Sequence, residues 1–406
     1  MRTESILLCA GLAVLSTAGR AFEKIAIVDN FDFARVFDTE TVKGTEQTLD
    51  HVLLTGADTI LWRPCSGGTM RYLSEEEPSV QMAAPLDPRR VPESRAVYGW
   101  LRYWRVRPDI IRTVFDSCAR RAVRQGIHWP YEENHWNYWT LGAWNLEHPQ
   151  YWCRNVDGVP WHGRCSFAFP EVLEHKMRIL DELLDRKPET LFFDLFRCGM
   201  WSVADEYVEP HLERWRARHG GTPPADSTDP RWLAIVGETQ EAFFRAVRAR
   251  IASRGLSVRV LLGIDGVTAS GADENWTYRA VDWKKLVREN VVDGIVIESV
   301  RPDPARPYAS TLAIYRSVAA AMGGKPFFCP IMQYNFGHGT RPGYPWYARQ
   351  TGDRPETAVR KLLELARDAG AAGIAMECVD HRNYSPAVCE TIKRFEGMTQ
   401  QKGPQK

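Results

Sequence analysis

Five acidic residues of this 406-residue chain share one kind of position, because each stands at the end of a short apolar run. The clearest case is "TLFFDLF" at 190–196, where Asp194 lies among Leu and Phe residues. Burying a carboxylate without a partner costs several kcal/mol, so such an acid indicates either a structural ion pair or a site that uses it. The other acids at run ends are Asp29, Asp265, Glu298 and Glu377, and one further run leads into Glu132 and Glu133.

Several carboxylates at one end of a fold are suited to breaking a glycosidic bond, because that reaction uses two of them. One carboxyl group protonates the leaving oxygen, while the other attacks the anomeric carbon or activates water. We predict Asp194 as the nucleophile or base and Glu298 as the general acid, on strands four and six, which we expect on facing sides of a cleft. Glu377 is the alternative to Glu298, and Arg197 is expected to keep Asp194 ionised.

Other interpretations of the same acids stay open. Each acid could form only a structural ion pair, the pairs being Asp194 with Arg197, Glu298 with Arg301, and Glu377 with Arg382. A metal site is a further alternative, and its ligands would be His128, His135, Asp194 and Glu298. These residues lack an HxH or HExxH spacing, so we predict no metal and no cofactor.

A long segment after the third apolar run has the composition of a sugar-binding loop. Residues 131–169, roughly forty positions, show no clear periodicity, and connections of that length are usually functional or disordered. Flat Trp and Tyr faces suit the C–H faces of sugar rings, and Asn, His and Glu suit the hydroxyl groups. About half of these aromatic residues are expected to form only a satellite core. The residues predicted to bind substrate are Asp29, Arg63, His128, Glu132, Asn134, His135, Trp136, Arg197, Asp265, Gln333 and Tyr334.

The elements that must hold these residues alternate along the chain. Eight apolar runs predict strands at 24–30, 59–64, 126–131, 190–196, 258–265, 293–299, 326–333 and 372–378. Amphipathic stretches predict helices that include 108–126, 170–187, 229–255 and 356–370. Eight strand–helix units predict an α/β fold, a (β/α)8 TIM barrel with long βα loops, notably after strands 2, 3 and 4. The active sites of such barrels lie at the C-terminal strand ends, where these acids stand.

The two ends of the chain and its net charge bear on the location of the protein, its domain bounds and its partners. Residues 1–21 have the pattern of a signal peptide, with Arg2, the apolar stretch "ILLCAGLAVL" and then small residues, so we predict export to the periplasm or the extracellular space. Residues 22–397 are expected to form a single barrel domain, followed by a flexible tail at 398–406. The formal net charge of +1 gives no basic footprint for nucleic acid, and no membrane partner is expected after signal cleavage.

The cysteine residues offer one candidate crosslink. Export permits disulfide bonds. Cys153 and Cys165 lie at the ends of the hairpin-like stretch "CRNVDGVPWHGRC", so we predict them as the best candidate pair. The other cysteine residues of the expected mature chain show no metal-type CxxC spacing.

Residues 125–200 resemble part of a known protein family. "LFFDLFR" is similar to the D-x-x-R strand end of glycoside-hydrolase-like TIM barrels, related to the family-10-like glycosyl hydrolase domains of secreted bacterial proteins. The stretch "ENHW…HPQYWCRNVDGVPWHGRCSFAFPEV" resembles their long third loop. The resemblance implies a TIM barrel that hydrolyses carbohydrate, with Asp194 as a catalytic residue and Arg197 beside it. A His-Pro or Tyr-Pro pair often follows the strand acid in such domains, whereas this chain has "RCGM".

The leading hypothesis is therefore an exported glycoside hydrolase that acts on a polysaccharide or an oligosaccharide. A carbohydrate-binding barrel without catalysis and a metal-dependent hydrolase are the alternatives. A hydrolase of the first kind needs two carboxyl groups roughly 5–10 Å apart across the cleft, whereas a binding protein needs only the aromatic residues. Bound metal in the purified protein would identify the third kind.

Overall fold

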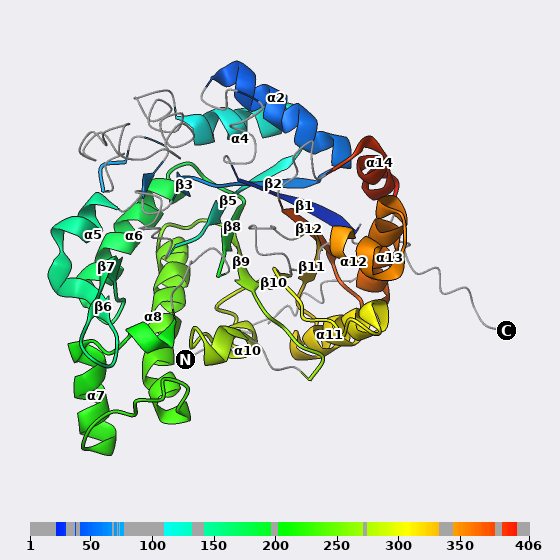
Figure 1. Cartoon of the computed structure of the whole chain (residues 1–406). Helices are drawn as coiled ribbons and strands as arrows, with labels where there is room; N and C mark the ends of the chain where they lie inside the picture. Colours follow the sequence, from blue (N-terminus) through cyan, green and yellow to red (C-terminus); the bar gives the residue numbers. More distant parts are fainter. Residues whose placement is uncertain are drawn as a thin grey trace, which may run out of the picture.

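Eight parallel strands close into a barrel at the centre of the protein (Figure 1). The computed structural model describes residues 22–29, 37, 41–66, 69–70, 72, 74–76, 109–131, 142–195, 202–270, 274–332, 344–377 and 384–395. The barrel strands are β1 (Glu23–Val28), β2 (Thr59–Trp62), β5 (Arg124–Trp129), β8 (Thr190–Phe193), β9 (Arg259–Ile264), β10 (Gly294–Ile297), β11 (Phe327–Met332) and β12 (Gly373–Glu377). The order around the barrel is β1-β12-β11-β10-β9-β8-β5-β2. The predicted (β/α)8 barrel is confirmed, and each strand overlaps its predicted run.

Helices surround the barrel on its outer side (Figure 1). They are α2 (Val42–Val52), α4 (Ile110–Arg120), α6 (Pro170–Leu184), α8 (Pro230–Ser253), α10 (Trp283–Arg288), α11 (Pro307–Ala321), α13 (Pro355–Asp368) and α14 (Pro386–Arg394). Shorter elements occupy the connections: α5 (Ala143–Glu147), α7 (Glu209–His219), α9 (Glu274–Thr277), α12 (Tyr344–Thr351), and the hairpins β3 (Cys65–Ser66) with β4 (Thr69–Met70) and β6 (Trp152–Arg154) with β7 (Pro160–Cys165). Pro in the first turn begins α6, α8, α11, α13 and α14, as expected for a residue whose missing N–H costs nothing there.

The barrel strands divide their side chains between two cores, because successive residues of a strand point to opposite faces. One set packs outward under the helices, and the other fills the barrel. The inner set is Ile25, Ile27, Leu61, Phe192, Leu261, Val296, Phe328 and Ala375. Two residues further along their strands, on the same inner face, come Asp29, Arg63, Asp194, Gly263, Glu298 and Glu377. A polar layer therefore lies directly above the apolar one, at the C-terminal end of the barrel.

An ion pair lies at the opposite, N-terminal end of the barrel. The carboxylate of Glu23 accepts hydrogen bonds from Arg259 at 2.8 and 2.9 Å and from the hydroxyl group of Thr59 at 2.7 Å. Burial acts to raise the pKa of Glu23, but the hydrogen bonds and the positive charges of Arg259 and Arg124 outweigh it and lower the pKa. The negative charge of Glu23 is therefore balanced by the positive charges of Arg259 and Arg124.

Two expectations about local structure are wrong. The helix expected over 108–126 ends at Arg120, because Ala122 adopts a positive φ of 55° and the chain enters β5 at Arg124. The predicted Cys153–Cys165 disulfide is not formed. In the β6–β7 hairpin Cys165 pairs with Trp152, so the neighbouring Cys153 points to the other face of the ladder.

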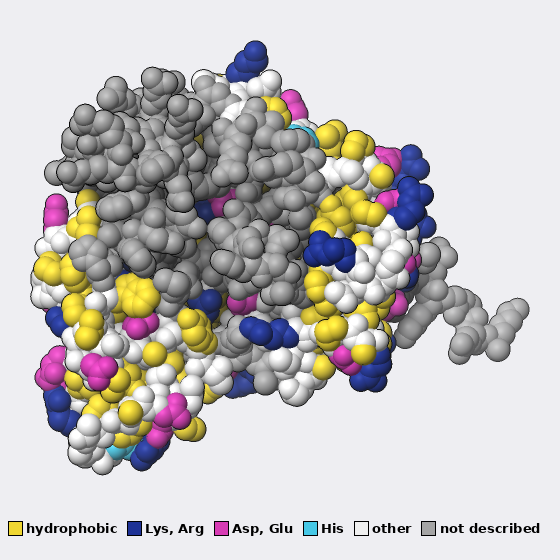
Figure 2. Space-filling view, viewed as in Figure 1, with side chains coloured by type: hydrophobic (Ala, Val, Ile, Leu, Met, Phe, Trp, Pro, Cys, Tyr) yellow, Lys and Arg dark blue, Asp and Glu magenta, His cyan; other side chains and the backbone are white. Residues whose placement is uncertain are grey.

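Surface features add little to the partner predictions. In Figure 2 the Lys and Arg side chains of the described residues lie singly among acidic and apolar ones on the face shown. No helix within the described ranges combines the length and the apolar character needed to cross a bilayer. The predicted signal peptide at 1–21 and the predicted tail at 398–406 lie outside the described residues.

We expect Glu23→Gln to lower the free energy of unfolding by about 2 kcal/mol, because it removes the charge that Arg259 binds. The lowered pKa means that this stabilisation is present above the ordinary pKa of a glutamate and is lost as the pH falls through the pKa of the folded protein. Denaturant unfolding of parent and variant over a pH series measures the difference. Glu213→Gln, at an exposed position of α7, is the matched control. An equal loss of stability in both variants would contradict the role of Glu23.

Candidate active site

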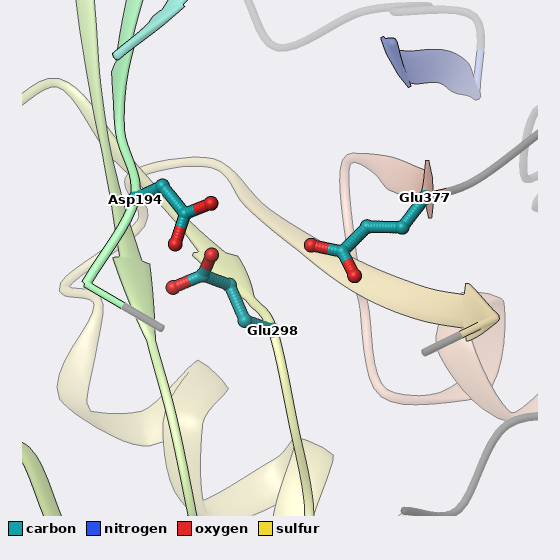
Figure 3. A group of neighbouring side chains, drawn as sticks. All are labelled: Asp194, Glu298 and Glu377. Carbon is teal, nitrogen blue, oxygen red and sulfur yellow. The ribbon is translucent and has the colours of Figure 1, made fainter. Parts of the chain in front are cut away.

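Three carboxyl groups meet on the inner face of the barrel at its C-terminal end. Asp194 follows β8, Glu298 follows β10, and Glu377 is the last residue of β12. One oxygen from each lies within 4.8 Å of the others. The three residues are 0%, 4% and 4% exposed, respectively. Figure 3 shows the carboxyl groups of Asp194 and Glu298 facing each other, with that of Glu377 directed toward them from the other side.

Backbone pairing continues past the strand ends and fixes two of these acids. The N–H of Asp194 donates to the carbonyl oxygen of Trp129 at 3.3 Å, and that of Glu298 donates to Ile264 at 2.7 Å. The alternation that places Phe192 and Val296 in the inner core therefore places Asp194 and Glu298 on the same face. The acids lie on the inner face because side chains two residues apart on a strand point to the same side.

The expectation that strands four and six face each other is wrong. Their counterparts, β8 and β10, are separated around the barrel only by β9, whereas β8 lies opposite β12. The acids still approach one another because their side chains all point toward the barrel axis (Figure 3). Asp194 and Glu377 therefore come from opposite walls, and Asp194 and Glu298 from nearly neighbouring strands.

Among the described residues, a histidine side chain contacts Asp194. Nε2 of His128 lies 2.6 Å from Oδ2 of Asp194, and both side chains are fully buried. The imidazole ring also stacks on Phe192, with ring centroids 5.3 Å apart. His128 was predicted to bind substrate, which stays a prediction, and the structure places it against Asp194. The predicted partner Arg197 lies outside the described residues.

The environment of Glu298 favours its protonated form. Burial is the largest cause that raises its pKa well above the usual range, followed by the negative charge of Asp194 and a hydrogen bond to that residue. Glu377 and Asp265 act in the same direction through their charges. The Asp194–Glu298 pair is therefore suited to hold one proton, carried by Glu298.

Three residues predicted to bind substrate already have protein partners. Asp29 forms a buried ion pair with Arg63, the second of these residues. The carboxylate of Asp265 accepts a hydrogen bond from the hydroxyl group of Ser299. These contacts hold the side chains in place at the barrel mouth. The remaining predicted binding residues, Glu132, Asn134, His135, Trp136, Gln333 and Tyr334, lie outside the described residues.

Several aromatic residues of the segment 131–169 pack against the main core, whereas a satellite core was expected for about half of them. Trp144 stacks on His148 and on His175, with ring centroids 4.1 and 4.2 Å apart. Tyr151 and Trp152 pack against the main core. Burial is the largest cause that lowers the pKa of His175 to about 3, so this imidazole ring is neutral at neutral pH. These residues are part of the packing that holds the β6–β7 hairpin.

The three carboxyl groups also have the chemistry of a site for a hard cation. Asp194, Glu298 and Glu377 supply oxygen atoms close enough to be shared by one ion, and calcium and magnesium prefer such ligands. Of the two histidines in the alternative metal site, His128 contacts Asp194 through Nε2, and His135 lies outside the described residues. A bound cation would compete with the proton on Glu298.

No family model and no curated protein matches this sequence, whereas solved structures do match. The PgaB (BpsB) glycoside hydrolase domain from Bordetella bronchiseptica is similar with a TM-score of 0.55 and 12% identity, over 87% of this chain and 93% of that domain. Alpha-L-fucosidase isoenzyme 2 from Paenibacillus thiaminolyticus has a TM-score of 0.54 and 12% identity, over 92% and 48% of the two chains. A catalytic mutant of Gan42B, a GH42 β-galactosidase from G. stearothermophilus, gives 0.55 and 14%, over 92% and 56%.

These similarities establish the fold. The neighbours are glycoside hydrolase TIM barrels, and this chain spans about half the length of the fucosidase and of the β-galactosidase. A relation to family 10 in particular stays a prediction. The comparison agrees with the closed parallel barrel read from the strand order.

We expect Glu298→Gln to remove a pH-dependent loss of stability. The folded protein holds the Glu298 proton more tightly than the unfolded chain, so this contribution is present at acidic pH and is lost as the pH rises through the raised pKa. Glutamine stays neutral and keeps a hydrogen-bond donor for Asp194. In thermal unfolding from acidic to alkaline pH, the melting temperature of the variant relative to that of the parent should therefore increase as the pH rises. Parallel curves for the two proteins would contradict the shared proton, and Glu213→Gln again serves as the control.

Proposed function

We propose that this protein is an exported glycoside hydrolase that cleaves O-glycosidic bonds of a polysaccharide or an oligosaccharide. The observation that carries the proposal is the contact between Asp194 and the proton-bearing Glu298 at the C-terminal mouth of the barrel. Hydrolysis of a glycoside needs one protonated and one ionised carboxyl group at the scissile bond. Similarity in fold to a fucosidase and a β-galactosidase supports a carbohydrate substrate, and the pattern of residues 1–21 supports export.

The roles of the two acids follow from their surroundings. Glu298 donates its proton to the glycosidic oxygen while the bond from that oxygen to the anomeric carbon breaks. A carboxylate oxygen of Asp194 bonds to the anomeric carbon and forms a glycosyl ester. Water then attacks this carbon, Glu298 takes a proton from the water, and Asp194 leaves as a carboxylate. His128, 2.6 Å from Asp194, orients the nucleophile throughout.

The close spacing of the acids favours this two-step route with retention. Retaining glycosidases hold their carboxyl groups about 5–5.5 Å apart, whereas inverting enzymes need about 6.5–9.5 Å to admit a water molecule. The nearest oxygen atoms of the three acids lie within 4.8 Å of one another, which is below the range of the inverting enzymes. We expect NMR of the first product to show the anomeric configuration of the substrate. A first product of opposite configuration would contradict Asp194 as the nucleophile.

We expect Asp194→Asn and Glu298→Gln to respond differently to the leaving group. Asp194→Asn loses activity on every glycoside, because no ester can form. Glu298→Gln loses on the order of 10²–10⁴-fold on alkyl glycosides. It loses far less on dinitrophenyl glycosides, because that leaving group departs without a proton. Values of kcat/KM on a panel of sugars, including fucosyl and galactosyl substrates, measure both effects.

Glu377→Gln is the matched control, since it removes the third acid of the same cluster. We expect a partial loss of activity that is similar for the two leaving groups. If instead Glu377→Gln shows the strong leaving-group dependence, Glu377 is the general acid and our assignment of Glu298 is wrong. Unchanged turnover by Asp194→Asn would contradict the assignment of Asp194 as the nucleophile. Sugar binding without any product would favour the non-catalytic barrel.

The carboxylate cluster favours one second candidate, a metal-dependent hydrolase. Three carboxyl groups with oxygens within 4.8 Å of one another are a plausible ligand set for a divalent cation. Stoichiometric metal in the purified protein, with activity lost to a chelator and restored by the cation, would support this candidate. Full activity in the presence of the chelator would support the two-carboxylate route.

A further inference from the structure

One barrel strand lacks a side chain in the layer where the acids meet. Gly263 lies on the inner face of β9, two residues after Leu261 of the inner core. This strand separates β8 from β10, the strands that lead to Asp194 and Glu298. Any side chain at position 263 would project between these two acids.

The space beside Gly263 is filled by the carboxyl group of Glu298. A Cβ atom added at position 263 would lie 3.0 Å from Oε1 of Glu298, and closer still to Cδ and Oε2. Its three nearest neighbours would all be atoms of that one carboxyl group. The Glu298 side chain therefore occupies the volume that the side chain of any other residue at position 263 would need.

The strand register explains why this volume matters. Phe193 pairs with Leu262, and one further step along the same register puts Asp194 beside Gly263. Ile297 pairs with Ile264, so the next step puts the backbone of Glu298 beside Asp265, two residues beyond Gly263. The carboxyl group of Glu298 nevertheless lies against Gly263, so its side chain leans across β9 toward the strand that leads to Asp194.

We infer that Gly263 is a positioning residue, whose missing side chain lets the carboxyl group of Glu298 reach Asp194. The catalytic consequence rests on the proposed function, whereas the contact itself does not. Because the obstructed group is the end of a flexible side chain, Gly263→Ala displaces Glu298 and leaves the strand in place. The barrel should fold, with the acid pair separated.

Gly294 on β10 provides a matched control. A Cβ atom there would lie 2.7 Å from the backbone oxygen of Pro326, which no side-chain rotation can relieve. We expect Gly294→Ala to lower the thermal stability more than Gly263→Ala does. Its effect on activity should be similar for all leaving groups, because it does not separate the acid from the nucleophile.

The first measurement needs no substrate. Thermal unfolding is followed over a pH series for the parent, Glu298→Gln, Gly263→Ala and the double variant. We expect the pH-dependent difference caused by Glu298→Gln to be smaller in the Gly263→Ala background, because Glu298 there lacks the adjacent charge and the hydrogen bond of Asp194. An undiminished difference would overturn the inference, whatever the fate of the proposed function.

The second measurement uses the leaving group as a probe of the acid. We expect Gly263→Ala to lose at least about tenfold more kcat/KM on alkyl glycosides than on dinitrophenyl glycosides, in the direction expected for a displaced general acid. Equal losses on both substrates, as in Gly294→Ala, would overturn the positioning role in catalysis. If no glycoside is cleaved but the pH-dependent coupling is found, the proposed function fails and the positioning of Glu298 by Gly263 stands.

Discussion

A proton shared by two buried carboxyl groups is the constraint on which the site depends. Two ionised carboxylates in contact would repel strongly where water is excluded, and burial disfavours both charges. One proton replaces that repulsion by a hydrogen bond between Asp194 and Glu298. His128 contacts Asp194 through Nε2, at Oδ2. The two acids therefore differ in protonation before any substrate arrives, which is the asymmetry that acid-assisted bond cleavage requires.

Buried acids at the two ends of the barrel have pKa shifts of opposite direction. At the N-terminal end Glu23 faces Arg259, so its charge is compensated and its pKa is lowered. At the C-terminal end Glu298 faces another acid, and its pKa is raised. The first arrangement stabilises the fold at neutral pH, and the second lowers stability as the pH rises. This contrast matches the general division of such barrels into a stabilising face and a functional face.

The sequence predicted the barrel well, because short apolar runs and amphipathic stretches report burial directly. It also predicted Asp194, Glu298 and Glu377 at strand ends, because the strand period carries a residue from the inner core to the mouth. It could not predict which side chains meet, since contact depends on register and on closure of the barrel. The contact of His128 with Asp194 and the close approach of Glu298 to Gly263 were missed for this reason. A signal did exist in "VRVLLGID", where a lone glycine interrupts a strand and marks a close approach.

The number of strands sets the strength of the electrostatic coupling among the acids. The interior of an eight-stranded barrel is just wide enough for side chains to fill it. Acids on the opposite strands β8 and β12 therefore bring oxygens within 4.8 Å of each other, although they start from opposite walls. The charge of Glu377 can then act on Glu298 and help it to retain its proton. In a wider barrel Asp194 and Glu377 would start further apart, so the size of the closed sheet helps to bring the three acids together.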